Sequence, residues 1–129
     1  MATTTEFDTL ADEFTTAIAE ADMATMRRLY TPDAVIWHCT DAIELSVDDL
    51  DTLLTGIGSV STCAVVVKER LHTAGGFVQT QENTYQLNAG GEVLLRAALV
   101  VTVTDDGLIS RVDEYLDGTA LAPLIAALS

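Results

Sequence analysis

The sequence predicts an α+β fold in which N-terminal helices pack on one face of a curved, mainly antiparallel sheet. Apolar residues recur at helical spacing before residue 60, long β runs follow, and glycine-rich turns join those runs. Such a sheet and its helices can form a cone-shaped α+β barrel that encloses a cavity. With 129 residues, 49% of them hydrophobic, the chain is expected to form one domain spanning residues 1–129.

Capping signals mark the first two predicted helices. Thr3-Thr-Thr-Glu6 resembles a capping box, and helical spacing then relates Phe7, Leu10, Ala11, Phe14 and Ile18. Asp22 can cap a second, shorter helix, because its carboxylate can accept from free backbone N–H groups. Thr31-Pro32 should end this helix, since the residue before a proline avoids the helical region.

A strand from Ala34 to Cys39 and a third helix are expected next. Ser46 with Asp49 begins the helix after a polar bend, and one face of it carries Leu50, Leu53, Leu54 and Ile57. Gly56 and Gly58 are expected to mark its end.

The rest of the chain is mostly predicted sheet. The β runs are Thr62 to Leu71, Phe77 to Leu87, Glu92 to Thr104 and Leu108 to Asp117. Glycines in the turns at 74–76, 89–91 and 105–107 permit the positive φ of hairpins. The apolar residues 121–128 suit a final helical turn or two.

Charge and composition exclude several classes of function. The formal charge of −14 repels phosphate backbones and anionic membranes, so we expect no nucleic-acid or membrane partner. Neither a signal peptide nor a membrane span is visible, which suggests a cytoplasmic protein. Cys39 and Cys63 lack metal or redox spacing, so neither a disulfide nor a metal site is expected. No phosphate-binding or dinucleotide-binding motif is present, and we expect no cofactor.

Glu114 is the strongest candidate for chemistry. Because strand residues alternate between faces, it shares an apolar, inward face with Val112 and Leu116. Burial without a cationic partner raises the pKa of a carboxyl group, which is one way in which proteins make general acids and bases. Asp113, Tyr115 and Asp117 fall on the other face.

A second polar feature alternates along the strand that begins at Phe77. Gln79, Gln81, Asn83 and Tyr85 share one face, which either lines a cavity with Glu114 and His38 as partners or is solvated. The opposite face, from Thr80 to Gln86, is polar as well, so periodicity leaves both readings open.

Two segments resemble the SnoaL-like group of the nuclear transport factor 2-like superfamily. They are Tyr30-Thr-Pro-Asp-Ala-Val-Ile-Trp-His38 and Ile109 to Asp117 followed by Ala122-Pro-Leu124. The group includes polyketide cyclases, ketosteroid isomerases, limonene epoxide hydrolases and non-catalytic binding proteins. The resemblance implies the cone-shaped fold and a homodimer formed through the outer face of the sheet.

Residue by residue, the resemblance is partial. In ketosteroid isomerases the general-base position falls on His38, and the tyrosine position falls on Phe14, which has no hydroxyl. A later-strand acid of the isomerases and cyclases falls near Leu99 and Val100, which are apolar. In the epoxide hydrolases the last-strand acid falls on Glu114.

The epoxide hydrolases also use an Arg and Asp pair, and its two positions fall on Gln81 and Asn83. Neutral amides can still hold water, but the cation is gone.

Our leading hypothesis is an enzyme that binds a small hydrophobic carbonyl, epoxide or polyketide-like molecule. His38 and Glu114 would share acid/base work as an isomerase, cyclase or hydrolase. The expected substrate-binding residues are Phe14, Gln79, Gln81, Asn83 and Tyr85. The alternative is a non-catalytic ligand-binding or dimerisation module in which the same polar wall only recognises a ligand.

Overall fold

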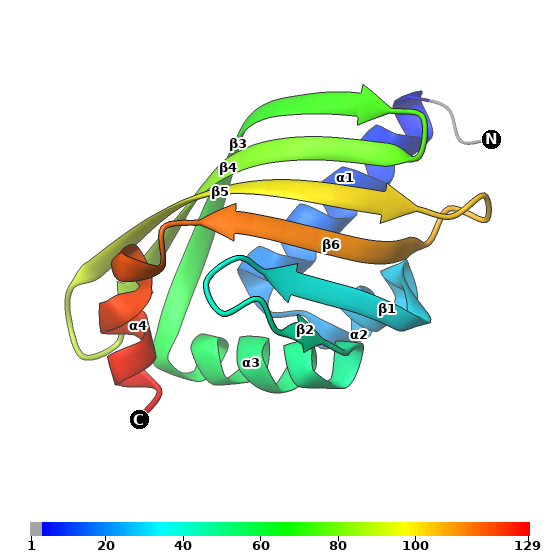
Figure 1. Cartoon of the computed structure of the whole chain (residues 1–129). Coiled ribbons are helices and arrows are strands. Elements are labelled where there is room, and N and C mark those ends of the chain that lie inside the picture. Colours follow the sequence, from blue (N-terminus) through cyan, green and yellow to red (C-terminus); the bar gives the residue numbers. More distant parts are fainter. Residues whose placement is uncertain (1–3) are drawn as a thin grey trace.

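The computed structural model describes residues 4–129, and Figure 1 shows helices packed against one curved sheet. The elements are α1 (Thr4–Glu20), α2 (Met23–Leu29), β1 (Tyr30–His38), β2 (Glu44–Leu45), α3 (Val47–Val60), β3 (Ser61–Thr73), β4 (Gly76–Leu87), β5 (Glu92–Val103), β6 (Ile109–Leu116), a 3₁₀ turn η1 (Gly118–Leu121) and α4 (Ala122–Ala127). The predicted α+β class and the four long β runs are confirmed.

The six strands form one sheet in the order β2-β1-β6-β5-β4-β3. Neighbouring strands pair antiparallel, except that β1 runs parallel to β6. The sheet is curved but does not close, because β2 and β3 are edge strands (Figure 1), and the expected barrel is therefore open along one side. The β1–β6 pairing places the first long strand and the last strand side by side, with His38 opposite Glu114.

Capping explains where the helices begin. Asp22 accepts a hydrogen bond from the backbone N–H of Thr25 at 3.2 Å, as the sequence predicted. Ser46 and Asp49 form a reciprocal capping box with both bonds at 3.1 Å. The capping box expected at the N-terminus begins at Thr3, which lies outside the described residues.

Besides shifts of one or two residues at other strand ends, the structure differs from the sequence prediction in three places. Helix α3 continues through Gly56 and Gly58 to Val60, because neither glycine has a positive φ there and apolar burial of its flanking residues outweighs the weak helical propensity of glycine. Strand β1 begins at Tyr30 rather than Ala34, and the β1–β6 register is interrupted between Tyr30 and Val35. Pro32 lies in that interval, where its missing N–H removes a ladder bond. The polar bend before α3 contains β2, which the sequence reading missed.

Glycines shape the hairpins in two ways. Gly90, Gly91 and Gly107 have φ of 101°, 98° and 83°, which the absence of a Cβ permits. Gly76 is different, because a Cβ there would lie 1.9 Å from the carbonyl oxygen of Val101 on the adjacent strand. A side chain at Gly76 would force β4 and β5 apart.

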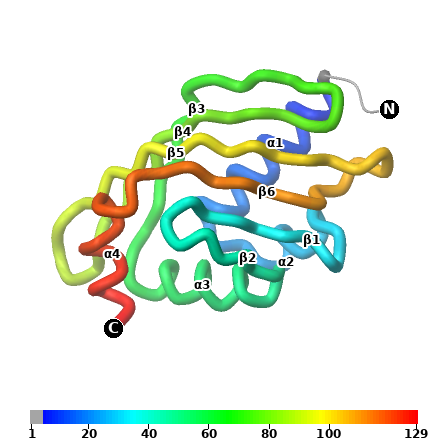
Figure 2. Tube along the Cα trace, in the orientation of Figure 1, coloured from blue at the N-terminus to red at the C-terminus, as the bar shows by residue number. Residues whose placement is uncertain are grey.

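Helix α1 crosses the inner face of the sheet, which is the face that the helices cover. The N-terminal end of α1 lies at the opposite end of the molecule from α4 (Figure 2). Phe14 of α1 meets Phe77 of β4 edge to face, with ring centroids 6.5 Å apart. Both side chains are almost completely buried. A smaller apolar cluster at the other end joins Tyr85, Val93, Leu95 and Leu124. The candidate functional residues lie where these two apolar regions meet.

Candidate functional site

A pocket of about 360 Å³ lies between the inner face of the sheet and helices α3 and α4. Its volume falls within the range of small-molecule sites, about 300–1,000 Å³. Most of its wall is aliphatic, including Leu50 and Leu54 of α3 and Leu124 of α4. The strands add a small polar set, His38, Gln81, Asn83, Tyr85 and Glu114. An apolar pocket with a few convergent polar groups suits a ligand with a mostly apolar body.

His38 and Glu114 form an ion pair at this wall. Parallel pairing of β1 with β6 places them side by side, and His38 Nε2 lies 2.7 Å from Glu114 Oε1. Their side chains are only 18% and 16% exposed. No hydrogen bond is found at the second carboxylate oxygen of Glu114 within residues 4–129, so the carboxylate can contact both His38 and a ligand.

The contact with Glu114 changes the titration of His38. The hydrogen bond to the carboxylate raises the pKa of His38 above its ordinary value of 6.5, against a smaller opposing effect of burial. The negative charge of nearby Asp41 acts in the same direction as Glu114. The contact with Glu114 therefore favours the protonated form of His38, and both side chains line the same pocket.

The alternating polar residues of β4 face inward. They form a hydrogen-bonded ladder in which Gln79 Nε2 donates to Gln81 Oε1 at 2.8 Å and Gln81 Nε2 donates to Asn83 Oδ1 at 2.8 Å. Asn83 Nδ2 then donates to the hydroxyl of Tyr85 at 3.2 Å. The three amides are almost completely buried. The sequence left the orientation of this face open, and the structure places it on the helix side of the sheet.

Not every expected ligand contact lines the pocket. Phe14, Gln81, Asn83 and Tyr85 contribute to its wall, but Gln79 does not. Gln79 lies further along the ladder, where it accepts from Arg70 Nε at 2.9 Å and donates to Thr15 Oγ1 at 2.9 Å. Gln79 therefore lies outside the wall of this pocket, and its contact with a ligand stays a prediction. Alternation along a strand predicts a shared face, but it does not predict where along that face a pocket ends.

Sequence reasoning also missed several polar groups around the pocket. Tyr30 lines it, and burial raises the pKa of its hydroxyl, so this group is a neutral O–H. Burial likewise raises the pKa of Tyr85. Asp41 and Asp49 contribute carboxylates, which disfavour an anionic ligand. Tyr30 belongs to the segment that resembles the family, but nothing in that segment marks it as a pocket residue. Asp49 was expected only as the capping partner of Ser46, and Asp41 carries no local motif.

A second hollow of about 560 Å³ lies between α1, α3 and β3, and Tyr85 lines both spaces. Cys63 pairs with Tyr85 across β3 and β4 and also lines this hollow. This hollow contains neither His38 nor Glu114. The 360 Å³ pocket is therefore the one in which the acid/base pair can act.

The outer face of the sheet holds the remaining polar and aromatic candidates. Trp37 packs against Tyr115, with ring centroids 5.4 Å apart, and Arg96 pairs with Glu82 on the adjacent strand at 2.8 Å. Asp113 pairs with Arg111 at 2.9 Å. These residues lie on the face opposite the pocket and have no contact with it.

Three further findings concern the part of the chain that the structure describes. Among residues 4–129 no group of three or more His, Cys, Asp or Glu side chains is placed to hold a metal ion. The helices in that part of the chain are too short or too polar to cross a membrane. Cys39 and Cys63 are free thiols.

Comparison with solved structures identifies the fold. The chain superposes on PrhC from Penicillium brasilianum with a TM-score of 0.87 at 15% identity, over 98% of this chain and 90% of that one. A protein from Shewanella putrefaciens gives a TM-score of 0.80 at 12% identity over 97% and 98% of the two chains. Its name, SnoaL-like polyketide cyclase, is an assignment made without experiment.

An epoxide hydrolase from M. tuberculosis, similar to limonene epoxide hydrolase, gives 0.76 at 18% identity over 96% and 95% of the two chains. No protein-family profile and no curated protein matches this sequence. At these identities the likeness shows the fold alone. The chain has the nuclear transport factor 2-like fold, which confirms the fold that the sequence resemblance implied.

Proposed function

We propose that this protein is an enzyme that moves a proton on a small, mostly apolar, uncharged molecule held in the 360 Å³ pocket. The observation that carries the proposal is the His38–Glu114 pair, 2.7 Å apart and four-fifths buried at the pocket wall. Proteins of similar structure include one named as a polyketide cyclase and one named as an epoxide hydrolase, and both of these reactions need proton transfer.

The geometry supports a division of labour. Glu114 would accept a proton through the carboxylate oxygen that His38 leaves free. Because Nε2 of His38 faces Glu114, the His38 imidazolium would donate the proton on its other nitrogen, Nδ1, to an oxygen of the ligand. Because the contact with Glu114 raises the pKa of His38, the donor form persists at higher pH than in a free imidazole. Proton transfer of this kind serves isomerisation, cyclisation and epoxide opening alike.

A generic proton-transfer assay tests the proposal without knowledge of the natural substrate. The probe is 2-decalone, a fused-ring ketone, and the signal is exchange of its α-protons for deuterium in D₂O, followed by NMR. We expect the protein to accelerate exchange above the buffer rate, and Glu114→Gln to lose at least a hundredfold of that acceleration, since general acid/base groups contribute about 10²–10⁴-fold.

The matched control is Asp113→Asn, which makes the same kind of change one residue away on the outer face. It should keep the wild-type rate. Equal rates in the wild-type protein and Glu114→Gln would refute the role of Glu114. Binding of the ketone without any exchange would instead favour a module that only recognises its ligand.

A further inference from the structure

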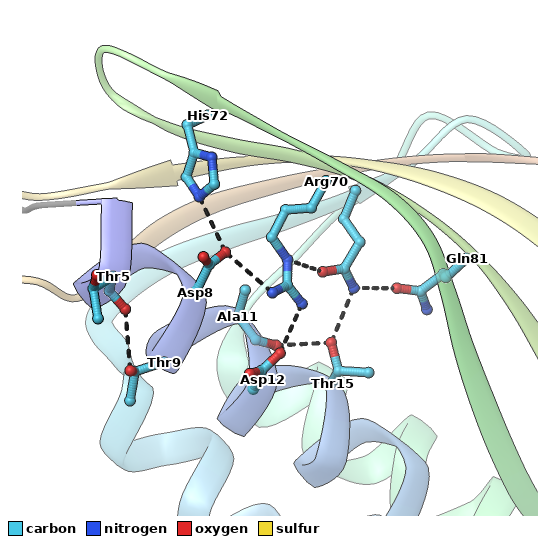
Figure 3. Close-up of polar contacts among 10 residues, drawn as sticks. Thr5, Asp8, Thr9, Ala11, Asp12, Thr15, Arg70, His72 and Gln81 are labelled. Carbon is cyan, nitrogen blue, oxygen red and sulfur yellow. Dashed lines mark hydrogen bonds and ion pairs between the residues drawn. The ribbon is translucent and has the colours of Figure 1, made fainter.

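Arg70 reaches the buried end of the amide ladder from strand β3. Its Nε donates to Gln79 Oε1 at 2.9 Å, and its terminal nitrogens pair with Asp8 at 3.3 Å and Asp12 at 3.0 Å on α1 (Figure 3). The side chain is only 14% exposed. A guanidinium group has donors and no acceptor, so the group that faces it must be an oxygen.

We propose that Arg70 fixes the direction of the ladder, so that Tyr85 at its pocket end accepts from Asn83, keeps its own O–H as a donor, and selects ligands with a neutral oxygen acceptor, such as a ketone. Arg70 is therefore a positioning residue that acts through Gln79. This inference rests on the proposed function in one respect, namely that the pocket holds a ligand.

Two contacts fix Gln79 independently. Arg70 requires the carbonyl oxygen of Gln79 on its side, so the amide NH₂ must point the other way. Thr15 requires the same orientation of the Gln79 amide. Its hydroxyl already donates to the carbonyl oxygen of Ala11 at 2.7 Å, so it must accept from the NH₂ of Gln79. A flipped Gln79 would set its NH₂ against the guanidinium. Both N–H groups of Gln79 are then used, one on Thr15 and one on Gln81.

The direction passes along the strand one amide at a time. Because Gln79 donates to the carbonyl of Gln81, the NH₂ of Gln81 faces Asn83, and the NH₂ of Asn83 faces Tyr85. Hydrogen bonds in such a chain polarise one another in the same sense. The ladder therefore has a carbonyl end at Arg70 and a donor end in the pocket.

The donor end carries the selectivity. Gln81 and Asn83 each keep one N–H and one carbonyl lone pair whichever way the ladder runs, so they give no preference. The hydroxyl oxygen of Tyr85 accepts from Asn83, which leaves the O–H of Tyr85 to donate to a ligand at the wall that it lines. Asp41, Asp49 and Glu114 line the same pocket and oppose a negative charge. An uncharged carbonyl or ether oxygen satisfies both conditions.

The wall also fits the acid/base pair. The ladder lies on β4 and Glu114 on β6, with only β5 between them. The register pairs Glu114 with Leu99 and Leu99 with Gln79, so Gln81 lies two strands across and two residues along from Glu114, roughly 12 Å away at the backbone. The ladder and Glu114 line the same pocket, so one ligand can contact both.

Gln79→Glu tests the direction with little change of shape. A carboxylate still accepts from Arg70 but cannot donate, so Gln81 must turn its NH₂ toward position 79 and the ladder should reverse. Gln86→Glu is the control, because it makes the same chemical change on the exposed face of the same strand. Side-chain NH₂ resonances of Gln81 and Asn83 report the reversal by nuclear Overhauser effects without any ligand.

Binding of 2-decalone gives the second readout. We expect the wild-type protein to lower the C=O stretching frequency of the bound ketone, and Gln79→Glu to weaken binding roughly tenfold and remove the shift, whereas Gln86→Glu does neither. Should Gln79→Glu fail to fold, Arg70→Lys and Arg70→Gln replace it. Lysine keeps a donor-only group and should retain the frequency shift, but glutamine can also accept and should weaken it.

Unchanged NH₂ contacts in Gln79→Glu, or ketone binding equal to the wild type with the same frequency shift, would overturn the inference. So would a wild-type protein that does not bind the ketone. These readouts measure binding and not proton exchange, so a ketone that binds in the predicted manner without exchange would refute the proposed enzyme and leave the ladder's direction supported.

Discussion

The His38–Glu114 pair should make the stability of the protein depend on pH, and Glu114→Gln should remove that dependence. His38 Nε2 and Glu114 Oε1 lie 2.7 Å apart, and both side chains are less than one-fifth exposed. Solvent therefore screens the interaction only in part. Hydrogen bonds to charged groups contribute roughly 1.5–3 kcal/mol. We expect a coupling of about 2 kcal/mol between the two side chains while His38 is protonated.

The sign follows from the raised pKa of His38. Above pH 6.5, its ordinary pKa, the folded protein holds a proton that the unfolded chain has lost. Stability therefore falls as pH rises through that interval. The contribution of the pair is fully present below pH 6.5 and is lost as pH rises through the raised pKa of the folded state.

A double-mutant cycle measures the coupling. Urea unfolding of the wild-type protein, Glu114→Gln, His38→Gln and the double variant is followed at about pH 6 and again at about pH 9, where imidazole is neutral. Asp113→Asn controls for loss of a neighbouring carboxylate. A coupling energy below about 0.5 kcal/mol at the lower pH, or one that is equal at both, would show that the pair is not the charged contact described here.

Two further changes test the fold. Gly76→Ala should destabilise the protein by at least about 1–3 kcal/mol, because its Cβ would overlap the carbonyl of Val101. Gly75→Ala is the control and should change the stability little, because the space around its Cβ is open. Equal unfolding midpoints for the two variants would contradict this account. Ser46→Ala should cost about 1 kcal/mol through loss of its capping bond to α3, and the exposed Thr52→Ala on the same helix should not; thermal unfolding of both decides it.

The strands and turns of this fold could be predicted because their signals are local. Gly90, Gly91 and Gly107 stand where positive φ is needed, and the β runs between them are long enough to leave little choice of register. Strand β2 has only two residues, Glu44–Leu45, and gains its strand conformation from pairing with β1 rather than from its own composition. Such a strand has no sequence signal.

The site was predictable only in its parts. Glu114 and His38 could be singled out from alternation and from the family resemblance, but their 2.7 Å contact depends on the parallel pairing of β1 with β6. Arg70 was missed because it stands between Glu69 and Leu71, which are both exposed. The partners that Arg70 binds come from α1 and β4, and a local sequence pattern cannot reveal them. Long-range contacts define the chemistry here.

The parallel pairing of β1 with β6 also determines when the site can exist during folding. Cys39 and Leu116, which are 77 positions apart in sequence, meet through a hydrogen bond at 3.4 Å immediately beside the acid/base pair. Closing a loop of this length lowers the conformational entropy of the chain before any favourable contact has formed. Contacts of this kind therefore form late in folding. During synthesis, β1 leaves the ribosome long before its neighbour is made. The pocket's polar pair thus appears only when the last strand docks, and its formation reports the completed fold.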